Sequence, residues 1–345
     1  MAGARVIKLL HSGRIGLAPM EGVIDAITRE LLSIEEGLDW AVTEFVRVID
    51  ARLPSRVFHK HCPELLQPQV ATPSGVPVHL QLLGSDPVAL AANAHQAVSL
   101  GAIGLDLNFG CPAKTVNRHD GGASLLRDPE RIYRAIEAVS QAVGHLVPVT
   151  AKLRLGFSDR RLALACALAA EAGGARQLVV HARTRDEGYR PPAHWEWIAR
   201  IRHQLAIAVI ANGDIWTLED YWKARSLSGC CDVMLGRGIL ADPWLARRIR
   251  HWQRTGQRLP ETPWPARAAM LGAYAERQRR TLPEKVVVSL LKQWLNQMRG
   301  RDAQAAQRFA MLRRETRLDP FIAGLGVETL RPIGIPLPST SAISA

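Results

Sequence analysis

Short apolar runs alternate along this chain with longer segments that have helical spacing. Segments with apolar residues three and four positions apart lie at Pro87–Leu100, Pro129–Val143, Leu162–Ala172 and Leu218–Leu227. The short runs have the length and composition of β-strands. They are Ile15–Ala18, Trp40–Thr43, Val78–Leu82, Ile103–Asn108, Pro148–Lys152, Gln177–Val180, Ala208–Ala211 and Asp232–Leu235, which makes eight. Strands that alternate with helices predict an α/β protein with a parallel sheet.

The residues just after each run favour a closed (β/α)8 TIM barrel over a doubly wound open sheet, which is the main structural alternative. In such barrels the catalytic groups lie on the loops at the carboxyl ends of the strands. Polar or glycine-rich segments follow the runs here, so we expect one rim to carry the site. They include Pro19-Met20-Glu21-Gly22, Glu44, Gln81, Asn108 to Pro112, Lys152 and Arg154, His181 and Arg183, Asn212-Gly213-Asp214 and Gly236-Arg237-Gly238.

The strand pattern stops near Trp252, and a proline-containing link at Leu259–Pro265 follows. Helical spacing then returns at Ala266–Arg280, Glu284–Arg299 and Asp302–Arg317. We therefore predict a barrel domain over residues 1–253 and a helical domain over residues 254–332. A disordered tail rich in small residues is predicted over residues 333–345.

The net charge of the chain indicates the kind of partner that it binds. The chain has 44 Lys and Arg against 32 Asp and Glu, a net charge of +12, which favours a polyanion such as nucleic acid. The segment Arg254–Leu330 holds 14 Lys and Arg against 7 Asp and Glu, so it carries +7 of that charge. A basic cytosolic enzyme without a nucleic-acid partner remains the alternative on this evidence.

Composition indicates a globular protein, since 47% of the residues are hydrophobic and 22% are charged. No apolar run reaches the roughly 20 residues that cross a bilayer, so we expect a cytoplasmic protein. The five cysteines show no CxxC spacing, so neither a disulfide framework nor a metal site is predicted.

Three features of the rim suggest an anionic cofactor. Asn212-Gly213-Asp214 and Gly236-Arg237-Gly238 follow the seventh and eighth strands, where barrels often bind phosphate, although tight turns alone would explain them. Lys152 closes an apolar strand, so it pairs either with an acidic neighbour or with an anionic ligand such as a reduced flavin. His181 fits a cofactor contact or a buried structural histidine.

Cys111 lies in a Gly-Cys-Pro turn, which the other four cysteines lack. An unperturbed thiol has a pKa of about 8.5, so Cys111 is mostly protonated at neutral pH and suited to act as a general acid. A nucleophilic role would require a neighbouring base or a lowered pKa.

These segments together resemble the tRNA dihydrouridine synthases. The resemblance rests on Ala18 to Gly22, Thr43-Glu44, Gln81-Leu82, Asp106 to Pro112, Lys114 to Asn117, Lys152 to Gly156, His181 to Thr184, Asn212 to Asp214 and Gly236 to Gly238. Thr43 to Val48 and Lys292 to Leu295 are similar to the bacterial subfamily called C, which modifies uridine 16 in the tRNA D-loop. Within that pattern, Leu290 stands where a basic residue is usual and Phe109 replaces a cysteine.

The resemblance implies the following site residues. FMN would be bound by Pro19, Met20, Glu21, Gln81, Lys152, His181, Asn212, Gly213, Asp214, Gly236 and Arg237. The proton donor would be Cys111, and tRNA would be contacted by Arg47, Asn108, Tyr189, Lys292, Gln297 and Arg313.

The resemblance also implies an activity: NADPH reduces FMN, and uridine in tRNA is reduced to 5,6-dihydrouridine by hydride transfer to C6 and protonation of C5 by Cys111. The uracil must be flipped out of the tRNA to reach these groups. The expected protein is a monomer that needs no metal. Alternatives are action at another D-loop uridine, a flavin barrel acting on a small pyrimidine as dihydroorotate dehydrogenases do, and an RNA-binding protein on an inactive barrel.

Overall fold

The computed structural model describes residues 12–118 and 120–326, and the chain divides by its contacts into two compact units at Pro260 and Glu261. The disordered tail predicted over residues 333–345 lies outside the described residues. The same holds for residues 327–332 of the predicted helical domain.

Within the described residues, the first unit is built around one sheet in which every pair of strands is parallel. Its strands run β2-β1-β9-β8-β7-β6-β5-β4-β3, and β2 also pairs with β4, which closes the sheet into a barrel. The doubly wound alternative is therefore wrong. The strands are β1 (Ile15–Leu17), β2 (Trp40–Val42), β3 (Val46–Arg47), β4 (Val78–Leu83), β5 (Leu105–Phe109), β6 (Val149–Arg154), β7 (Gln177–His181), β8 (Ala208–Asn212) and β9 (Val233–Leu235).

The ninth segment, β3, is the strand that the sequence pattern missed. β2 pairs with the start of β4 at Val78, whereas β3 pairs with its end at Leu82 and Leu83. Both segments therefore occupy one barrel position, and the barrel has the eight positions that were predicted. Two residues are too few to show an alternating pattern. Elsewhere some predicted strand ends are wrong by one or two residues. The two-residue errors are at Ile103, since β5 begins at Leu105, and at Lys152, since β6 runs to Arg154.

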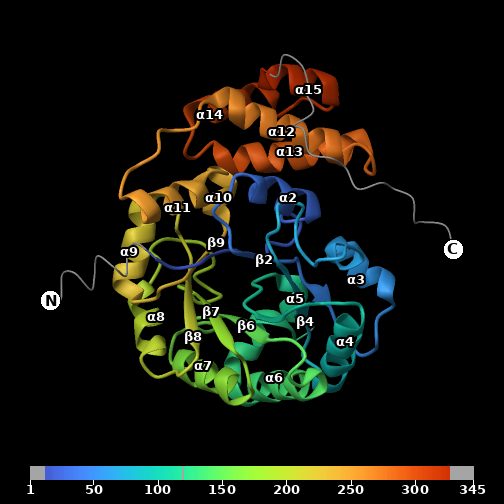
Figure 1. Ribbon diagram of the computed structural model, residues 1–345, viewed down its shortest axis with the longest axis vertical. Coiled ribbons are helices and arrows are strands. Elements are labelled where there is room, and N and C mark those ends of the chain that lie inside the picture. The colour runs from blue at the N-terminus through green and yellow to red at the C-terminus, as the bar shows by residue number, and fades with distance from the viewer. Residues whose placement is uncertain (1–11, 119, 327–345) are drawn as a thin grey trace. The chain divides into compact units, whose positions relative to one another are not determined.

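Helices surround the barrel, as Figure 1 shows. Neighbours in this ring contact each other in chain order, from α4 through α6, α7, α8 and α9 to α11. Their bounds are α4 (Pro87–Ser99), α6 (Pro129–Val143), α7 (Ala163–Ala172), α8 (Trp195–Arg202), α9 (Leu218–Ser228) and α11 (Leu245–Thr255). Shorter or additional helices are α2 (Ala26–Ile34), α3 (Ser55–His61), α5 (Lys114–Arg118), α10 (Arg237–Ala241) and the 3-10 turns η1 (Pro63–Leu66) and η2 (Gly122–Arg127).

Apolar side chains fill the barrel interior below the mouth. Val179, Ile210 and Met234 from β7, β8 and β9 pack with Trp40 and Val42 from β2, and all five are buried. Because side chains alternate along a strand, the residue two positions after each of these shares its face. His181 and Asn212 thus continue the interior face of Val179 and Ile210 toward the carboxyl end.

The second unit is helical within its described residues. It consists of α12 (Trp264–Gln278), α13 (Glu284–Met298), α14 (Ala303–Leu312) and α15 (Leu318–Leu325), and α13 contacts the other three (Figure 1). The face of α13 that was predicted to pack is buried, namely Leu291, Trp294, Leu295 and Met298.

The helix predicted over Asp302–Arg317 is wrong at its carboxyl end, because α14 stops at Leu312 with Arg313 as its C-cap. A separate helix, α15, then begins at Leu318 with Pro320 in its first turn. Proline has no backbone N–H and favours the first turn of a helix, so a continuous helix would break there. The side chain of Glu315 accepts the N–H groups of Thr316 and Arg317 in the break.

Candidate active site

The interior face of the barrel becomes polar at the carboxyl ends of its strands. Across neighbouring strands Gln81 is in register with Asp106, and Asn108 with Lys152. Arg154 is in register with His181, which is in register with Asn212. Parallel strands in register bring these side chains to one mouth, as the sequence predicted from strand ends alone.

Cys111 lies two residues after β5, in the loop that leads to α5. Its backbone N–H donates to Oδ1 of Asn108 at 2.9 Å, and its carbonyl accepts from Nδ2 of Asn117 at 3.0 Å. The side chain is partly exposed and packs against a buried cluster of Phe45, Leu83 and Val116. The loop is therefore anchored at its backbone, while the sulfur keeps access to the mouth.

The Cys111 thiol is protonated at neutral pH. Burial raises its pKa above the usual value for cysteine, and the charge of Glu21 adds to the rise. A hydrogen bond from the backbone of Ala113 and the charges of Arg154 and Lys152 oppose that rise. These cations would also stabilise the thiolate that remains after the thiol gives up a proton.

Lys152 is the cation inside the mouth. Burial lowers the pKa of its amino group to about 8, with repulsion from Arg154 adding to the fall and attraction by Asp106 opposing it. Within residues 12–118 and 120–326, no carboxylate forms an ion pair with this amino group. The structural alternative for Lys152, an ion pair with an acidic neighbour, is therefore not what the described residues show.

His181 is buried at the end of β7 and is neutral at physiological pH. Burial, followed by the charges of Arg154 and Lys152, lowers the pKa of its imidazole well below the usual value. Nδ1 of His181 is buried and has no hydrogen-bond partner within the described part of the chain. A buried ring nitrogen without a partner is costly unless a ligand satisfies it.

The loops after β8 and β9 lie side by side and carry a cluster of charges. Asp214, which has a φ of 51°, forms ion pairs with Arg183 and with Arg237, the latter at 3.1 Å. Arg237 also lies over the rings of Tyr189 and Trp216, at 4.3 and 4.9 Å from their centroids. The Asp214 carboxylate is thus held by arginines, so only the backbone of this residue remains suited to an anion.

Gly236 lies beside the loop after β1. A Cβ atom on Gly236 would meet only Ala18 Cβ and Met20 Sδ, each at 3.9 Å. The carbonyl of Met20 accepts the N–H groups of Val23 and Ile24, which ties down the turn that contains Pro19 and Glu21. The loops after β1 and β9 are therefore within van der Waals reach of each other at Gly236.

The six predicted tRNA contacts are divided between the two units. Arg47 ends β3, and Tyr189 is half-exposed beside His181, their ring centroids 6.3 Å apart. Asn108 points into the same mouth, but both ends of its amide already have partners. On the helical unit, Arg313 is exposed, and Lys292 and Gln297 are partly exposed, with Glu315 close enough to Lys292 to feel its charge.

Two residues of the mouth were quoted from the sequence but not assigned to the site. Arg154 is 4% exposed and donates to the carbonyl oxygens of Gly110, Thr184 and Gly188. Asp106 is 1% exposed and accepts from Gln81 and Thr150. A carboxylate within an apolar strand, two residues before Asn108, was the signal for Asp106.

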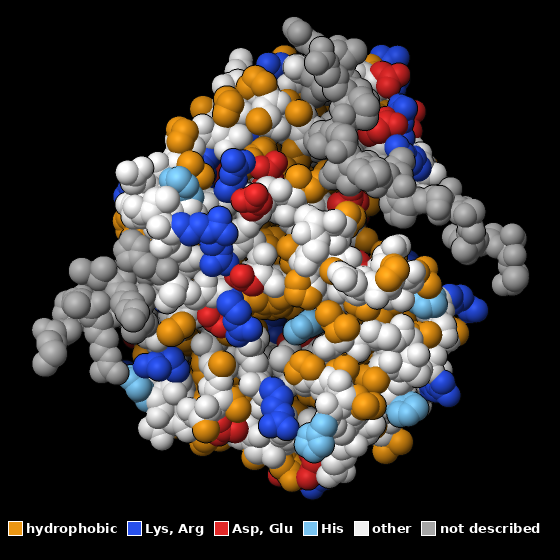
Figure 2. Space-filling view, in the orientation of Figure 1, with side chains coloured by type: hydrophobic (Ala, Val, Ile, Leu, Met, Phe, Trp, Pro, Cys, Tyr) orange, Lys and Arg blue, Asp and Glu red, His pale blue; other side chains and the backbone are white. Residues whose placement is uncertain are grey.

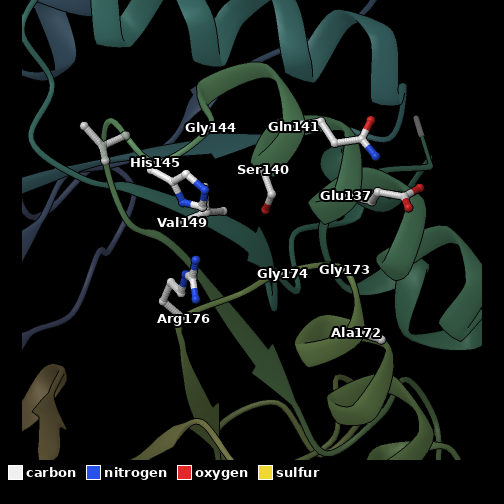
Figure 3. A pocket seen from close by; sticks show the side chains of 11 residues that line it. Glu137, Ser140, Gln141, Gly144, His145, Val149, Ala172, Gly173, Gly174 and Arg176 are labelled. Carbon is white, nitrogen blue, oxygen red and sulfur yellow. The ribbon is translucent and has the colours of Figure 1, made fainter.

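A pocket of about 420 Å³ lies at the other end of the barrel (Figure 3). Its lining includes Ser140 of α6, Val149 at the start of β6, and His145 and Arg176 from loops. Because Lys152 and Arg154 lie near the carboxyl end of β6, this pocket is separated from the mouth by the length of the strand. It is no part of the candidate site.

Within the described residues, no group of His, Cys, Asp or Glu side chains is arranged to hold a metal ion. No helix in the same part of the chain is long and apolar enough to span a membrane.

A closed parallel barrel with a lysine, a neutral histidine and a protonated thiol at its carboxyl-terminal mouth is the architecture of a TIM-barrel enzyme. The dihydrouridine synthase (Dus) family model matches residues 16–317. The chain belongs to this family and is an oxidoreductase that acts on a CH–CH bond.

Several relatives are similar over most of their length, and each bears the name tRNA-dihydrouridine(16) synthase. The protein from Aquipseudomonas alcaligenes is 46% identical over 90% of this chain and 99% of its own. The protein from Ralstonia nicotianae is 48% identical over 87% of this chain and 91% of its own. The Escherichia coli K12 protein is 44% identical over 87% and 93%.

Solved structures with the same barrel are distant in sequence. The 6-hydroxypseudooxynicotine amine oxidase from Pseudomonas geniculata N1 has a TM-score of 0.54 and 11% identity, covering 77% of this chain and 50% of that chain. Histamine dehydrogenase from Rhizobium sp. 4-9 has a TM-score of 0.53 and 13% identity, covering 70% and 46%. At these identities the likeness shows the fold alone.

Proposed function

We propose that this protein reduces uridine to 5,6-dihydrouridine at position 16 of the tRNA D-loop, with FMN as cofactor and NADPH as reductant. The observation that carries this proposal is the presence of Lys152 and a protonated Cys111 at one barrel mouth. The relatives that share most of this chain support the tRNA substrate and the position. Action at another D-loop uridine is the nearest alternative. The proposal places the protein in the cytoplasm as a monomer.

The residues at the mouth fit a flavin mononucleotide. The positive charge of Lys152 and the unpartnered Nδ1 of His181 suit the polar edge of an isoalloxazine ring. The lack of a side chain at Gly236 and the positive φ of 112° at Gly213 suit a backbone that approaches a phosphate closely. The FMN contacts remain those expected from the sequence, with two differences. The Asp214 carboxylate acts through Arg183 and Arg237, and both ends of the Gln81 amide already have protein partners.

Bound there, FMN that NADPH has reduced would supply a hydride to C6 of the uracil. Cys111 would transfer the proton of its thiol to C5, so that one hydrogen adds to each carbon of the double bond. Its raised pKa keeps the proton on sulfur until the base arrives, and solvent protonates the thiolate afterwards. Arg154 and Lys152 lower the energy of that thiolate, which favours the transfer.

A uracil within folded tRNA must leave its stack to reach Cys111, at a cost of a few kcal/mol. Contacts to the phosphate backbone can offset this cost. Figure 2 shows basic and acidic side chains mixed on one face of the molecule, so the RNA contacts must be inferred from individual cations rather than from net charge.

One side of the barrel carries cations without acidic partners. α3 contacts β3, and Val116 of α5 packs on Phe45, the residue before β3. Five cations lie on these elements, and none has an ion-pair partner within the described residues: Arg47, Arg56, Lys60, Lys114 and Arg118. In contrast, Arg160, Arg161 and Arg185, after β6 and β7, are each paired with a carboxylate. An unpaired cation offers its full charge to a phosphate, so the elements that flank β3 are the proposed backbone contact of the barrel.

The helical unit would supply the remaining contacts. A second face of α13 carries Lys285, Lys292 and Asn296, and Arg299, the C-cap, continues it; all four are at least partly exposed. We assign this unit to tRNA binding, with Lys292, Gln297 and Arg313 as its contacts.

A small pyrimidine substrate is the second candidate, because a flavin and a cysteine would also serve a dihydroorotate dehydrogenase-like reaction. Such a substrate gives no reason for a basic helical unit or for unpaired cations beside β3. An inactive RNA-binding barrel has no need of the thiol and the lysine together.

Mapping dihydrouridine in tRNA from a strain that lacks this gene tests the proposal. We expect the modification to be missing at position 16 and to return with the wild-type gene. Loss at a different D-loop uridine would support the alternative position, and an unchanged tRNA pattern would contradict the tRNA substrate.

A further inference from the structure

A chain of hydrogen bonds links the loop of Cys111 to a carboxylate inside the barrel. Oδ2 of Asp106 accepts from Nε2 of Gln81 at 2.7 Å, and Oε1 of Gln81 accepts from Nδ2 of Asn108 at 2.9 Å. Oδ1 of Asn108 then accepts the backbone N–H groups of Gly110 and Cys111, both at 2.9 Å. We call Asp106, Gln81 and Asn108 the amide chain.

The direction of every bond in the amide chain follows from the carboxylate. Burial raises the pKa of the Asp106 carboxyl, but Oδ2 is an acceptor in either protonation state because a proton on the carboxyl can reside on Oδ1, which faces the Thr150 hydroxyl. Gln81 must therefore turn its NH2 group toward Oδ2. The carbonyl end of Gln81 therefore faces Asn108, which donates to it from its own NH2 group. Oδ1 of Asn108 is left facing the loop, where two N–H donors need an acceptor.

Register and burial hold the amide chain in place. Gln81 and Asp106 are in register on β4 and β5, and they are 0% and 1% exposed. Thr150 fixes the other carboxylate oxygen through a hydrogen bond of 2.6 Å to Oδ1. Water has little access to replace a lost partner, so an amide turned the wrong way would leave donors facing donors.

We propose that Asp106 is a positioning residue that, through the amides of Gln81 and Asn108, holds the loop that presents the Cys111 thiol. Its importance for catalysis rests on the proposed function, in which that thiol protonates uracil. Asp106 does not itself reach the thiol or the substrate in this role.

Exchanging the carboxylate and the amide between positions 106 and 108 tests the direction of the hydrogen bonds in the amide chain. Asn108→Asp alone places carboxylates on both sides of Gln81, whose single NH2 group cannot face both. Adding Asp106→Asn allows the Gln81 amide to turn around. The new amide at position 106 can then donate to the carbonyl of Gln81, and the new carboxylate at position 108 can accept from the NH2 group of Gln81. The loop N–H groups keep an acceptor at position 108 in the double variant.

Asp106→Asn alone is the matched control. Its amide can donate to Thr150, which can in turn donate to the carbonyl of Leu105, 3.3 Å away. The amide oxygen then still accepts from Gln81, so this variant should resemble the wild type.

The measurement is the rate at which Cys111 is alkylated by iodoacetamide, followed by mass spectrometry of its peptide in the full-length protein. Exposed Cys231, beside β9, reports in the same sample on any general change in reactivity. We expect Asn108→Asp to speed alkylation of Cys111 by about ten-fold, the factor for loss of one or two hydrogen bonds. Asp106→Asn alone should keep the wild-type rate at Cys111, and the double variant should restore a rate near it. The rate at Cys231 should be constant throughout.

An unchanged Cys111 rate in Asn108→Asp overturns the proposal, as does a double variant no better than Asn108→Asp. If Asn108→Asp does not fold, recovery of folded protein by the second substitution supports the proposal, and failure of both variants to fold counts against it. Alkylation does not depend on tRNA or NADPH, so its outcome is independent of whether the proposed function is correct.

Discussion

Nε of Arg154 donates a hydrogen bond of 2.8 Å to the carbonyl oxygen of Gly110, the residue before Cys111. The same guanidinium donates to the carbonyl oxygens of Thr184 and Gly188, in the loop after β7. One buried side chain thus joins the loop that carries the thiol to the loop that carries Tyr189. It can do so because a guanidinium has five N–H donors in a fixed plane.

Replacing Arg154 should therefore destabilise the barrel. Arg154→Met leaves three carbonyl groups without their donor in a site that water barely reaches, so we expect the free energy of unfolding to fall by roughly 2–4 kcal/mol. Urea denaturation followed by circular dichroism measures the change. Arg161→Met is the control, since that side chain is 88% exposed and, among the residues that the structure describes, its ion-pair partner is Asp159. Equal stability of the two variants would show that the Arg154 bonds contribute little.

The charge on Lys152 should make flavin binding depend on pH. With a pKa of about 8, the amino group is charged at pH 7 and loses its proton as the pH rises through 8. We expect FMN affinity of the cofactor-free protein to fall by about ten-fold between pH 7 and 9.5, as for loss of one charge-assisted contact. Quenching of FMN fluorescence gives the affinity at each pH.

Two substitutions at this position separate Lys152 from other titrating groups. The arginine in Lys152→Arg keeps its charge across this pH range, so the FMN affinity of this variant should not change with pH. Lys152→Met should bind FMN weakly at every pH, and its FMN affinity should also not change with pH. A slope in Lys152→Met like that of the wild type would assign the pH dependence to another group.

The same pKa has a consequence for folding. The folded pKa lies below the usual lysine value of about 10.4, so between pH 8 and 10 the unfolded chain binds more protons than the folded one. Stability of the cofactor-free protein therefore gains a contribution from Lys152 as the pH rises through this window. Lys152→Met should lack that gain, which denaturant titrations at pH 7 and 9.5 can measure.

The unpaired cations beside β3 should set the salt dependence of tRNA binding. Arg56→Glu with Lys60→Glu should weaken tRNA binding sharply and flatten the plot of log affinity against log salt, because fewer counterions are released. Lys292→Glu with Arg313→Glu should do the same from the helical unit. Fluorescence anisotropy with labelled tRNA measures both, and reduction of the flavin by NADPH should be unchanged.

Arg161→Glu with Arg185→Glu is the comparison for this experiment, because both arginines are already paired with carboxylates. These substitutions should leave the salt slope near that of the wild type. If all three double variants lost affinity equally, net charge rather than particular contacts would govern binding.

The positions of the main strands and of the mouth residues could be predicted from the sequence, because local patterns determine both. Lys152 and His181 each end an apolar run, and parallel strands bring such ends together whatever the register. Cys111 follows from its Gly-Cys-Pro turn. The short strand β3 has too few residues to give a pattern, and the break after Leu312 is signalled by Pro320 rather than by the helical spacing.

Contacts between side chains on different strands could not be predicted in this way. Asp106 and Gln81 lie 25 positions apart and meet only because β4 and β5 pair in one register. A shift of one residue would turn both side chains to the opposite face of the sheet. The pairing of Asp214 with Arg183 and Arg237 likewise depends on how the segments after β7, β8 and β9 come together.

The central claim is that Cys111 protonates a tRNA uracil at a flavin-containing mouth. The direct measurement is single-turnover formation of dihydrouridine at position 16, with unmodified tRNA added to NADPH-reduced enzyme. The account predicts that Cys111→Ala keeps its FMN content and tRNA affinity but forms product about 10² to 10⁴ times more slowly than the wild type. Product formation at the wild-type rate by Cys111→Ala, or no dihydrouridine with the flavin-loaded wild type, would contradict it.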